Sequence, residues 1–548
     1  TNSAVRIDPR DNVIIALTDF RQCDSLAFEG ENFTFASDVF AKHKFATRDL
    51  APGDLVIMYG GVVGKAVVRI ARGEAITTRN IRHEASEFHS REGDFRWTPP
   101  DVSNWRSATF NGYHRSDGRV GTRNHWIVLP LVFCENRNLS VLKQAFEEEL
   151  GFAAPQIYRR QVAELVRLHL AGKTSEIVAH TFASKSAPDS LQRIFPNLDG
   201  IKFLLHEAGC GGTHEDARNL CGLLAGYICH PNVAGATVLS LGCQHAQVAM
   251  LMEEVQKRTP KFDKPLLVFE QQKSASESAM MSQAVKETFL GLVEANKLER
   301  RPANISNLTV GLKCGGSDGF SGITANPAIG HTADLLAALG GTGILSEFPE
   351  LCGVEQELIN RSVSNEVGER FIQLMRDYAA RAKAVRSGFE MNPSPGNIRD
   401  GLITDAMKSA GAAKKGGTSP VTSVLDYPER ANTPGLNLLC TPGNDVECVT
   451  AQTAAGANIV LFTTGLGTPT GNPVTPVIKI STNSNLAARM SDIIDFDTGG
   501  IVSGATSIEK TGEEILTEIL RVASGEIHTK AEQLSQDDFI PWKRGVSL

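Results

Sequence analysis

The spacing of apolar residues changes along the chain and predicts several regions. Residues 1–92 contain short alternating apolar runs separated by Gly-Asp, Gly-Gly and Arg-Gly turns, the pattern of a small β domain. Residues 93–108 carry a Pro pair and little periodicity, which predicts a linker. Beyond them, strand-like runs alternate with stretches such as 161–172 and 245–258, where apolar residues recur every three or four positions. This alternation predicts α/β architecture.

A second break falls near residues 301–307, before another strand-like run. We therefore expect a central α/β domain over residues 109–300 and a C-terminal α/β domain over residues 301–548, both with mainly parallel sheets. The length of 548 residues agrees with this division, because single hydrophobic cores rarely grow beyond about 250–300 residues.

Five of the predicted strands end at a cysteine that is followed by turn residues. They end at Cys134, Cys210, Cys243, Cys314 and Cys440. In an open α/β sheet the carboxyl ends of the strands form the ligand crevice, so the five thiols suggest one shared active-site rim. The alternative for any single cysteine is a small buried hydrophobic residue. The other five are interpreted as structural: Cys23, Cys221, Cys229, Cys352 and Cys448.

Composition and charge exclude several classes of function. The net charge of −7 gives no general basic field, which argues against binding nucleic acid or an acidic membrane surface. No run approaches the roughly 18–20 apolar residues of a membrane-spanning helix. The N-terminus lacks a signal-peptide pattern, so we expect a cytoplasmic protein with reduced cysteines. Neither common nucleotide-binding glycine motif occurs, which disfavours nucleotide ligands.

The densest run of polar residues predicts a site for a small anionic substrate. It spans residues 111–125 and contributes Arg115, Arg119 and Arg123, with Asn124 beside the last. Guanidinium groups bind carboxylates through two parallel hydrogen bonds. A solvated basic hairpin is the alternative, but the apolar strand that follows almost at once favours the binding site.

Two Cys-Gly-Gly turns could bind an anion or a metal. Residues 206–216 hold two His, one Cys, three carboxylates and three glycines, and residues 313–322 add Ser317 and Asp318. Glycines let backbone N–H groups turn toward an anion, while His, Cys and carboxylate side chains can ligate a divalent metal. Neither spacing is that of a zinc site, so the metal is not identified by sequence.

Residues 346–357 bring together Glu347, Glu350 and Glu355 around a Pro and a Gly. Oxygen ligands suit magnesium, manganese or ferrous iron, which makes Glu347 a candidate metal ligand. An acidic first turn of a helix explains the cluster equally well.

His43 and Lys44 follow a strand-like run in the predicted β domain. Histidine suits proton transfer near neutral pH, and the adjacent Lys44 could hold a carboxylate. A single His is more often a satisfied surface or core residue, and the neighbouring lysine raises the odds of a catalytic role.

Several long segments resemble the altronate and galactarate dehydratase family of sugar-acid dehydratases. They are GYHRSDGRVGTRN, HEAGCGGTHED, LSLGCQH, KCGGSDGFSGITANPA, EFPELCGVEQ and GLGTPTGNPVTPVIK. The resemblance runs from the HKFA segment to the closing DDFIPWKRGVSL. Within the family, PLVFCENRN and DDFIPWKRG are most similar to the altronate dehydratases, with galactarate dehydratase as near neighbour.

The resemblance implies a β-clip domain of the antifreeze-like (SAF) type over residues 1–92 and a divalent metal, commonly ferrous iron. It implies conversion of D-altronate to 2-dehydro-3-deoxy-D-gluconate with loss of water. His43 and Lys44 match the family's Gly-His-Lys segment. Mn²⁺ or Mg²⁺ stays open as the metal, as does an iron–sulfur cluster. Candidate metal ligands are Cys134, Cys210, Cys243 and Glu347.

The mechanism expected of such an enzyme needs a base at C2 and an acid at C3. His43 is the first candidate for one of these roles, and the three arginines would hold the substrate carboxylate. We expect a small-molecule sugar-acid substrate and a homo-oligomer, most simply a dimer. The alternatives are galactarate dehydration, elimination of sulfite from a short hydroxy acid, or a sugar-acid-binding protein that has lost catalysis.

One segment departs from the family pattern. Many members carry a GEHVHxHN stretch after the last turn of the β-clip, whereas this chain has GEAITTRN. Ala75, Thr77 and Arg79 stand where those histidines would fall. If that stretch binds metal elsewhere in the family, this chain requires other ligands, or His83.

Overall fold

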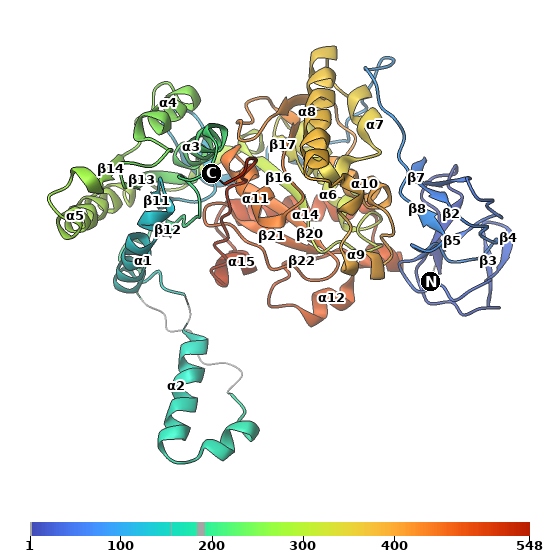
Figure 1. Cartoon of the computed structure of the whole chain (residues 1–548), viewed down its shortest axis with the longest axis horizontal. Helices are drawn as coiled ribbons and strands as arrows, with labels where there is room; N and C mark the ends of the chain where they lie inside the picture. The colour runs from blue at the N-terminus through green and yellow to red at the C-terminus, as the bar shows by residue number, and fades with distance from the viewer. Residues whose placement is uncertain (1–2, 155, 183–191, 548) are drawn as a thin grey trace.

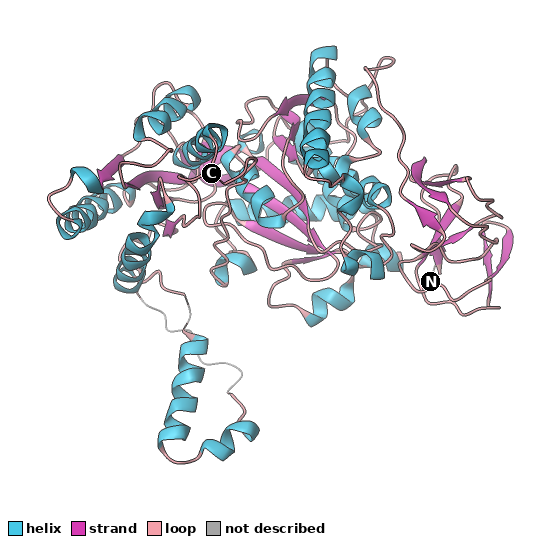
Figure 2. Cartoon of the chain, in the orientation of Figure 1, coloured by secondary structure: helices cyan, strands magenta, loops and turns pink. Residues whose placement is uncertain are grey.

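Three regions follow one another in the computed structural model, which describes residues 3–154, 156–182 and 192–547 (Figure 1). The first is a compact arrangement of short antiparallel strands. The second and third are built on parallel sheets of four and seven strands, each flanked by helices (Figure 2). The predicted fold class, a small β domain followed by two α/β domains with mainly parallel sheets, is confirmed.

The β domain consists of three small sheets whose apolar side chains form two clusters on either side of β2. The strands are β1 (Ala4–Val5), β2 (Val13–Ala16), β3 (Ser25–Phe28), β4 (Glu31–Thr34), β5 (Lys44–Ala46), β6 (Leu55–Met58), β7 (Gly61–Ala66) and β8 (Ile81–Arg82). They pair as β1-β2-β5, β3-β4 and β6-β7-β8. This domain shares a hydrophobic cluster with Ile403, Met407 and Ala410 from the C-terminal region, and Thr404 Oγ1 donates to Val63 O at 2.6 Å. The β domain is therefore docked on the C-terminal domain.

The central sheet has the strand order β12-β11-β13-β14, with all neighbours parallel. The strands are β11 (His125–Pro130), β12 (Gly200–Phe203), β13 (Val233–Ser240) and β14 (Leu266–Glu270). β11 and β13 are buried along their whole length, as expected for parallel strands covered on both faces. Helices α1 (Asn136–Leu150) and α5 (Glu277–Ala295) cover one face, and α3 (His214–Ile228) and α4 (Val248–Arg258) cover the other.

One helix of the central domain, α2 (Ile157–Leu170), projects away from the body of the molecule (Figure 1). None of its residues is buried, and its apolar side chains Tyr158, Val162 and Leu170 are exposed. Across the described ranges, no helix combines the length and the apolar character that crossing a membrane requires.

The C-terminal sheet has the order β18-β19-β17-β16-β20-β21-β22, again parallel throughout. Its strands are β16 (Thr309–Cys314), β17 (Thr342–Leu345), β18 (Val421–Leu425), β19 (Gly435–Leu439), β20 (Ile459–Thr464), β21 (Val477–Ser481) and β22 (Phe496–Asp497). Helices α6 (Ala325–Ala338) and α14 (Ile508–Ala523) pack on one face. On the other face α11 (Asp445–Ala454) packs against α3, so the two α/β domains share one continuous core.

The long helix α8 and several shorter helices complete the described part of the C-terminal region. They are α7 (Glu355–Asn360), α8 (Asn365–Ala384), α9 (Pro395–Arg399), α10 (Asp405–Ala412), α12 (Ser484–Arg489), α13 (Gly500–Ser503) and α15 (Lys530–Gln533). The last turn of α8 approaches the first turn of α3, where Arg381 pairs with Glu215 at 3.0 Å.

The chain segments that enter and leave the central domain pair with each other in one small antiparallel sheet. β9 (Thr109–His114) pairs on one side with β10 (Val120–Gly121) and on the other with β15 (Arg301–Asn304). The chain therefore enters and leaves the central domain at the same place.

Both parallel sheets contain a topological switch point. The chain passes from β11 outward to β12 and then returns to the other side of β11 to form β13 and β14. In the same way it passes from β16 to β17 and later forms β20 on the other side of β16. Ligand crevices form outside the carboxyl ends of strands at such points. The fold thus offers two candidate rims, one on each sheet.

We expect the packing around Trp126 to tolerate no added methyl group. Trp126 is fully buried, and a Cβ at Gly291 of α5 would lie 2.2 Å from its ring. Alanine normally stabilises a helix relative to glycine by about 1 kcal/mol, but this overlap should instead lower the free energy of unfolding by about 1–3 kcal/mol. Urea unfolding followed by circular dichroism measures the change for Gly291→Ala. Gly368→Ala in α8 is the matched control, because its nearest contact would be an ordinary 3.4 Å; equal effects of the two substitutions would contradict the packing argument.

Candidate active site

A cavity of about 600 Å³ opens at the carboxyl edge of the seven-stranded sheet. It lies beside the ends of β16 and β17, under the last turns of α8, and at the amino end of α11. Side chains from several of these elements line it: Cys314, Glu350, Tyr378, Asn392, Lys408 and Asp445. The position is the one that the switch point between β16 and β20 predicts.

Beneath the cavity, three lysines face three carboxyl groups. Lys313 pairs with Glu347 and with Asp445, the latter at 2.9 Å. Lys415 Nζ lies 2.7 Å from Glu347 Oε2 and 2.8 Å from Cys314 Sγ. Both lysines are almost completely buried, and each therefore requires a negative partner.

The third pair borders the cavity itself. Lys408 Nζ donates to Glu350 Oε1 at 2.8 Å and to Asn392 Oδ1 at 2.6 Å. The Cys314 thiol lies 3.2 Å from Glu350 Oε2. Lys408, Glu350 and Asn392 thus form a hydrogen-bonded chain that a bound ligand can reach.

Local backbone geometry places Glu347. It lies two residues beyond the end of β17 and adopts the left-handed conformation with φ of 64°, which is uncommon for a non-glycine residue. Its backbone N–H donates to Thr441 Oγ1 at 3.0 Å in the loop after β19. Such strained residues concentrate at functional sites.

The buried lysines set the charge state of the carboxyl groups beside them. Burial opposes ionisation of Glu350, but Lys408, Lys313 and Lys415 outweigh it and lower the pKa of Glu350 to about 2. Burial raises the pKa of the Cys314 thiol to about 12, so this thiol is neutral at pH 7. Burial opposes the charge of Lys408, yet Glu350 prevails and raises its pKa. The three ammonium groups of this network are therefore balanced by three carboxylates.

The donor set Cys314, Glu347 and Glu350 lies close enough to hold a metal ion, since its ligand atoms are all within 4.8 Å of one another. However, Lys313 and Lys415 occupy the oxygens of Glu347, and Lys408 occupies one oxygen of Glu350. A divalent ion would lie beside three ammonium groups and would have to displace them. The arrangement favours the ion-pair network over a bound cation.

Behind the cavity, Asp405 begins α10 and is 1% exposed. Burial, followed by repulsion from Glu350, raises its pKa to about 9. Cys352 lies in the same region, 3.9 Å from His83 Nε2, and Ala406 N–H donates to His83 Nδ1 at 3.3 Å. His83 thus joins the end of the β domain to α10.

His43 and Lys44 lie where the β domain docks on the C-terminal domain. Lys44 is fully buried and donates to Gly401 O at 2.6 Å and to Lys42 O at 3.0 Å; burial lowers its pKa to about 7. His43 Nε2 lies 2.9 Å from Arg399 O, and burial lowers the pKa of its imidazole. Neither lines the large cavity. Their catalytic roles stay predictions.

Ser317 and Asp318 lie in the turn after β16, between the cavity and the docked β domain. Asn397 of the cavity wall donates to Ser317 O at 2.8 Å. The buried Asp318 accepts from Thr482 Oγ1 at 3.0 Å and pairs with Lys42 at 3.0 Å. Asp318 therefore has structural partners, whereas Ser317 Oγ is buried without one among the described residues.

The arginine segment lies at the amino ends of the central strands, opposite the carboxyl edge. Arg115 is buried and donates to Pro231 O at 2.7 Å, and Arg119 pairs with Asp117. Arg123 is fully buried and pairs with Glu532 at 2.6 Å. Asn124 Nδ2 donates to Asn197 O at 2.9 Å. The structure does not bring these predicted substrate ligands together with the predicted metal ligands.

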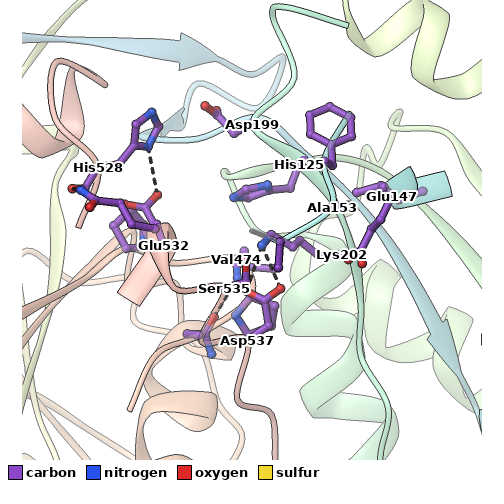
Figure 3. A pocket seen from close by; sticks show the side chains of 18 of the residues that line it. His125, Glu147, Ala153, Asp199, Lys202, Val474, His528, Glu532, Ser535 and Asp537 are labelled. Atoms are coloured by element: carbon purple, nitrogen blue, oxygen red, sulfur yellow. Dashed lines mark hydrogen bonds and ion pairs between the residues drawn. The ribbon is translucent and has the colours of Figure 1, made fainter. Parts of the chain in front are cut away.

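A second cavity, of about 240 Å³, lies near these arginines between the central domain and α15 (Figure 3). His125, Lys202, Glu532 and Asp537 face it, and Lys202 pairs with Asp537 at 2.9 Å (Figure 3). The charged groups of this cavity largely pair with one another. They leave little free charge for a ligand.

The expected single rim of five cysteines is wrong, because the five strands belong to two sheets. Cys314 and Cys440 are buried at the carboxyl edge of the large sheet. Cys134, Cys210 and Cys243 are exposed at the carboxyl edge of the central sheet. The sequence indicated that each thiol follows a strand. Which thiols meet depends on the order of the strands in the sheets, and that order follows from tertiary pairing.

The three lysines of the cavity were not singled out by sequence. The position of Lys313 could have indicated a buried ion pair. It is the last residue but one of an apolar strand, and a buried lysine normally has a charged partner. Lys408 and Lys415 carried no such signal, since lysines within helices and in the turns after them commonly lie at the surface. Asn392 and Asp445 lay in Gly/Pro-rich loops that indicated binding without naming a residue.

Three family models match successive parts of the chain. The Altronate/galactarate dehydratase SAF domain matches residues 2–84, and the second domain of D-galactarate dehydratase/Altronate hydrolase matches residues 112–296. The C-terminal domain of D-galactarate/Altronate dehydratase matches residues 305–547.

Similar proteins extend over the whole length. An altronate dehydratase of Bacillus subtilis (strain 168) is 33% identical over 100% of both chains. An altronate dehydratase of Escherichia coli (strain K12) is 33% identical over 99% of both chains. A galactarate dehydratase (L-threo-forming) of the same strain is 30% identical over 96% of this chain and 94% of the relative.

Asp405 gives the site a defined pH dependence. Its pKa is about 9 in the folded chain and about 3.9 when unfolded, so between these values the folded state binds one more proton. This group therefore lowers stability by about 1.4 kcal/mol per pH unit as the pH rises. Asp405→Asn removes the effect, and its stability advantage over the wild type should grow at that slope from pH 5 to pH 8.

Thermal and urea unfolding across this range measure the difference. Asp492→Asn, at an exposed position, is the control and should show no growth with pH. A constant offset for Asp405→Asn would mean that Asp405 is ionised in the folded protein.

Proposed function

The chain belongs to the D-galactarate/altronate dehydratase family, and on this premise we propose that it dehydrates D-altronate to 2-dehydro-3-deoxy-D-gluconate. It is a sugar-acid hydro-lyase, and the choice of D-altronate is the proposal. One observation carries that choice: two altronate dehydratases match the chain from end to end at 33% identity, against 30% for the galactarate enzyme.

The cavity at the end of β16 is the proposed substrate site. Its volume of about 600 Å³ accommodates a six-carbon acid, and its walls carry amide, ammonium and carboxylate groups suited to hydroxyl groups. Lys408 is the ammonium at its surface and would hold the substrate carboxylate or the departing hydroxyl. The amino end of α11, capped by the Asn444 side chain, adds a positive dipole to the same wall.

Dehydration removes the proton from C2 and the hydroxyl from C3, and the enol formed then becomes the 2-keto acid. Glu350 is ionised and borders the cavity, which makes it the proposed base. With its pKa held near 2 by the lysines, Glu350 is a weak base while Lys408 is bonded to it. A substrate oxygen that takes over the Lys408 ammonium would remove the largest of these attractions and raise the proton affinity of Glu350.

The hydroxyl at C3 leaves as water once it is protonated. Lys408 carries an ammonium proton within hydrogen-bond distance of Glu350 and Asn392. We assign it the role of acid, with Asn392 orienting its ammonium. The tight buried pairs of Lys313 and Lys415 hold β16, β17 and the loop after α10 in place, so that the reacting groups are fixed before substrate binds. His43 remains the alternative acid or base that the family resemblance suggests.

We further propose that the enzyme requires iron. Cys134, Cys210 and Cys243 are the residues that would hold it, because their thiols are free and exposed and follow three neighbouring parallel strands. Iron supplies Lewis-acid chemistry toward carboxylate or hydroxyl oxygens, but these thiols do not line the cavity proposed for the substrate, so we route no step of the dehydration in that cavity through it. Glu347 as a metal ligand requires the lysines to move aside and stays a prediction.

Location and assembly complete the proposal. All ten cysteines are free, which supports a reducing compartment such as the cytoplasm. A homo-oligomer, most simply a dimer, stays a prediction that molar mass measured by light scattering tests.

The activity is tested directly with D-altronate and galactarate under anaerobic conditions with ferrous iron. A semicarbazide or thiobarbiturate assay measures the 2-keto-3-deoxy acid, and we expect D-altronate to be preferred. Release of sulfite from sulfolactate would instead support a sulfo-lyase. Binding without any product would leave a sugar-acid-binding protein and contradict the proposal.

Lys408→Met should lower kcat/KM by about 100-fold or more, since it removes the proposed acid. Asn392→Ala should lower kcat with a smaller change in stability, because it misdirects the same ammonium. Lys383→Met on the exposed side of α8 is the control and should stay within about twofold of the wild type. If His43→Gln abolishes turnover while Lys408→Met does not, the acid lies at the docked β domain instead.

A further inference from the structure

We propose that Cys134, Cys210 and Cys243 bind a [4Fe–4S] cluster at the carboxyl edge of the central sheet, leaving one iron without a protein ligand. The inference does not depend on the substrate proposed above. It depends on the placement of these three thiols, on the helices behind them, and on buried oxygens beside them.

Sheet order places the three thiols around one point. β11 lies between β12 and β13, and all three run parallel, so their carboxyl ends leave the sheet at the same edge. Neighbouring strands are about 4.8 Å apart, which puts the outer two strand ends about 10 Å from each other. Cys134, Cys210 and Cys243 follow these three strands in turn, and the switch point lies between β11 and β13.

Backbone hydrogen bonds join the three loops. Phe133 N–H donates to Ala208 O at 3.1 Å, and Ala246 N–H donates to Gly209 O at 3.0 Å. Gly209 has a φ of +104°, and a Cβ there would lie 2.1 Å from Leu131 O. The close approach of the loop after β12 to the end of β11 therefore requires glycine. Each cysteine lies within a few residues of one of these contacts.

The separation of the thiols distinguishes a cluster from a single ion. Thiolates on one metal ion lie at most roughly 4.6 Å apart, twice a metal–sulfur bond of about 2.3 Å. Among the described residues, only Cys314, Glu347 and Glu350 form a His, Cys or carboxylate group within 4.8 Å, so the three exposed thiols are more widely spaced. In a cluster each thiolate binds a different iron, which suits the wider spacing.

The surroundings favour a negatively charged group. Helices α1, α3 and α4 all begin just after these cysteines, and their amino ends carry partial positive charge. Neither α1 nor α4 has a side-chain cap on its first N–H groups. Gln272 Nε2 also donates to Cys243 Sγ at 3.2 Å, a contact of the kind that tunes cluster potentials.

Two buried oxygens next to Cys134 point to a ligand. Glu135 is fully buried, and its Oε1 has no hydrogen-bond partner among the described residues. Asn136 Oδ1 is also buried without one in the same set. Buried acceptors are normally satisfied, and these two would accept hydrogen bonds from the protons of a ligand bound beside Cys134.

The test uses protein expressed and purified without oxygen. We expect about four iron atoms and four acid-labile sulfides per chain, with broad visible absorption. Cys134→Ser, Cys210→Ser and Cys243→Ser should each lose more than half of the sulfide, while Cys23→Ser in the exposed β domain should lose none. One iron without sulfide, or full sulfide in all three variants, would overturn the proposal.

A second measurement needs no variant. In the wild type kept anaerobic, iodoacetamide should label Cys134, Cys210 and Cys243 far more slowly than Cys23, although all four are exposed. Removing iron with a chelator after oxidation should make the four rates similar. Equal rates before chelation would overturn the proposal. Formation of the keto acid is measured separately. A protein that holds the cluster but forms no keto acid contradicts only the proposed function. A protein that forms the keto acid but holds no cluster contradicts only this inference.

Discussion

The structure of the C-terminal domain depends on the mutual neutralisation of Lys313 and Lys415 by Glu347. Both ammonium groups are buried, and removing Glu347 would leave Lys415 without a carboxylate partner in the core, at a cost of several kcal/mol. The carboxylate comes from the turn after β17, and the two lysines come from β16 and from the turn after α10. One carboxylate thereby joins three segments that are far apart in sequence. The chain Lys408–Glu350–Asn392 and the cavity that it borders lie directly beside that junction.

Apolar periodicity was sufficient to predict the fold class, because it reflects burial that is local to each strand and helix. The small β region and the alternation of strands and helices were both visible in that pattern. Strand order was not, since it follows from pairings between residues that lie far apart. The cysteines illustrate the difference: each was correctly placed after an apolar strand, yet Cys314 and Cys134 lie on different sheets. The same limit hid the cavity, whose lysines become informative only when their carboxylate partners are known.

The arginine segment shows how composition can mislead. Arg115, Arg119 and Arg123 look like a carboxylate site because guanidinium groups are strong donors. In the structure the same donors are directed at carbonyl oxygens and at Glu532, and they fasten the amino edge of the central sheet to α15. Bidentate donors are equally useful for holding loops together, and a sequence does not distinguish the two uses. The exposed thiols at the other edge form no disulfide and stay accessible from solvent.

The pairing of β9 with β15 bears on the order in which the protein forms during synthesis. β9 leaves the ribosome long before β15, and the whole central domain is translated between them. The sheet β10-β9-β15 can close only when the central domain has become compact enough to bring its two ends together. Since domains generally fold as units from the N-terminus, the sheet of the central domain forms first, and the face of α3 that belongs to the shared core is covered when the C-terminal domain is assembled on it. The pairing of β15 with β9 therefore forms late in synthesis, after the central domain has brought its two chain ends together.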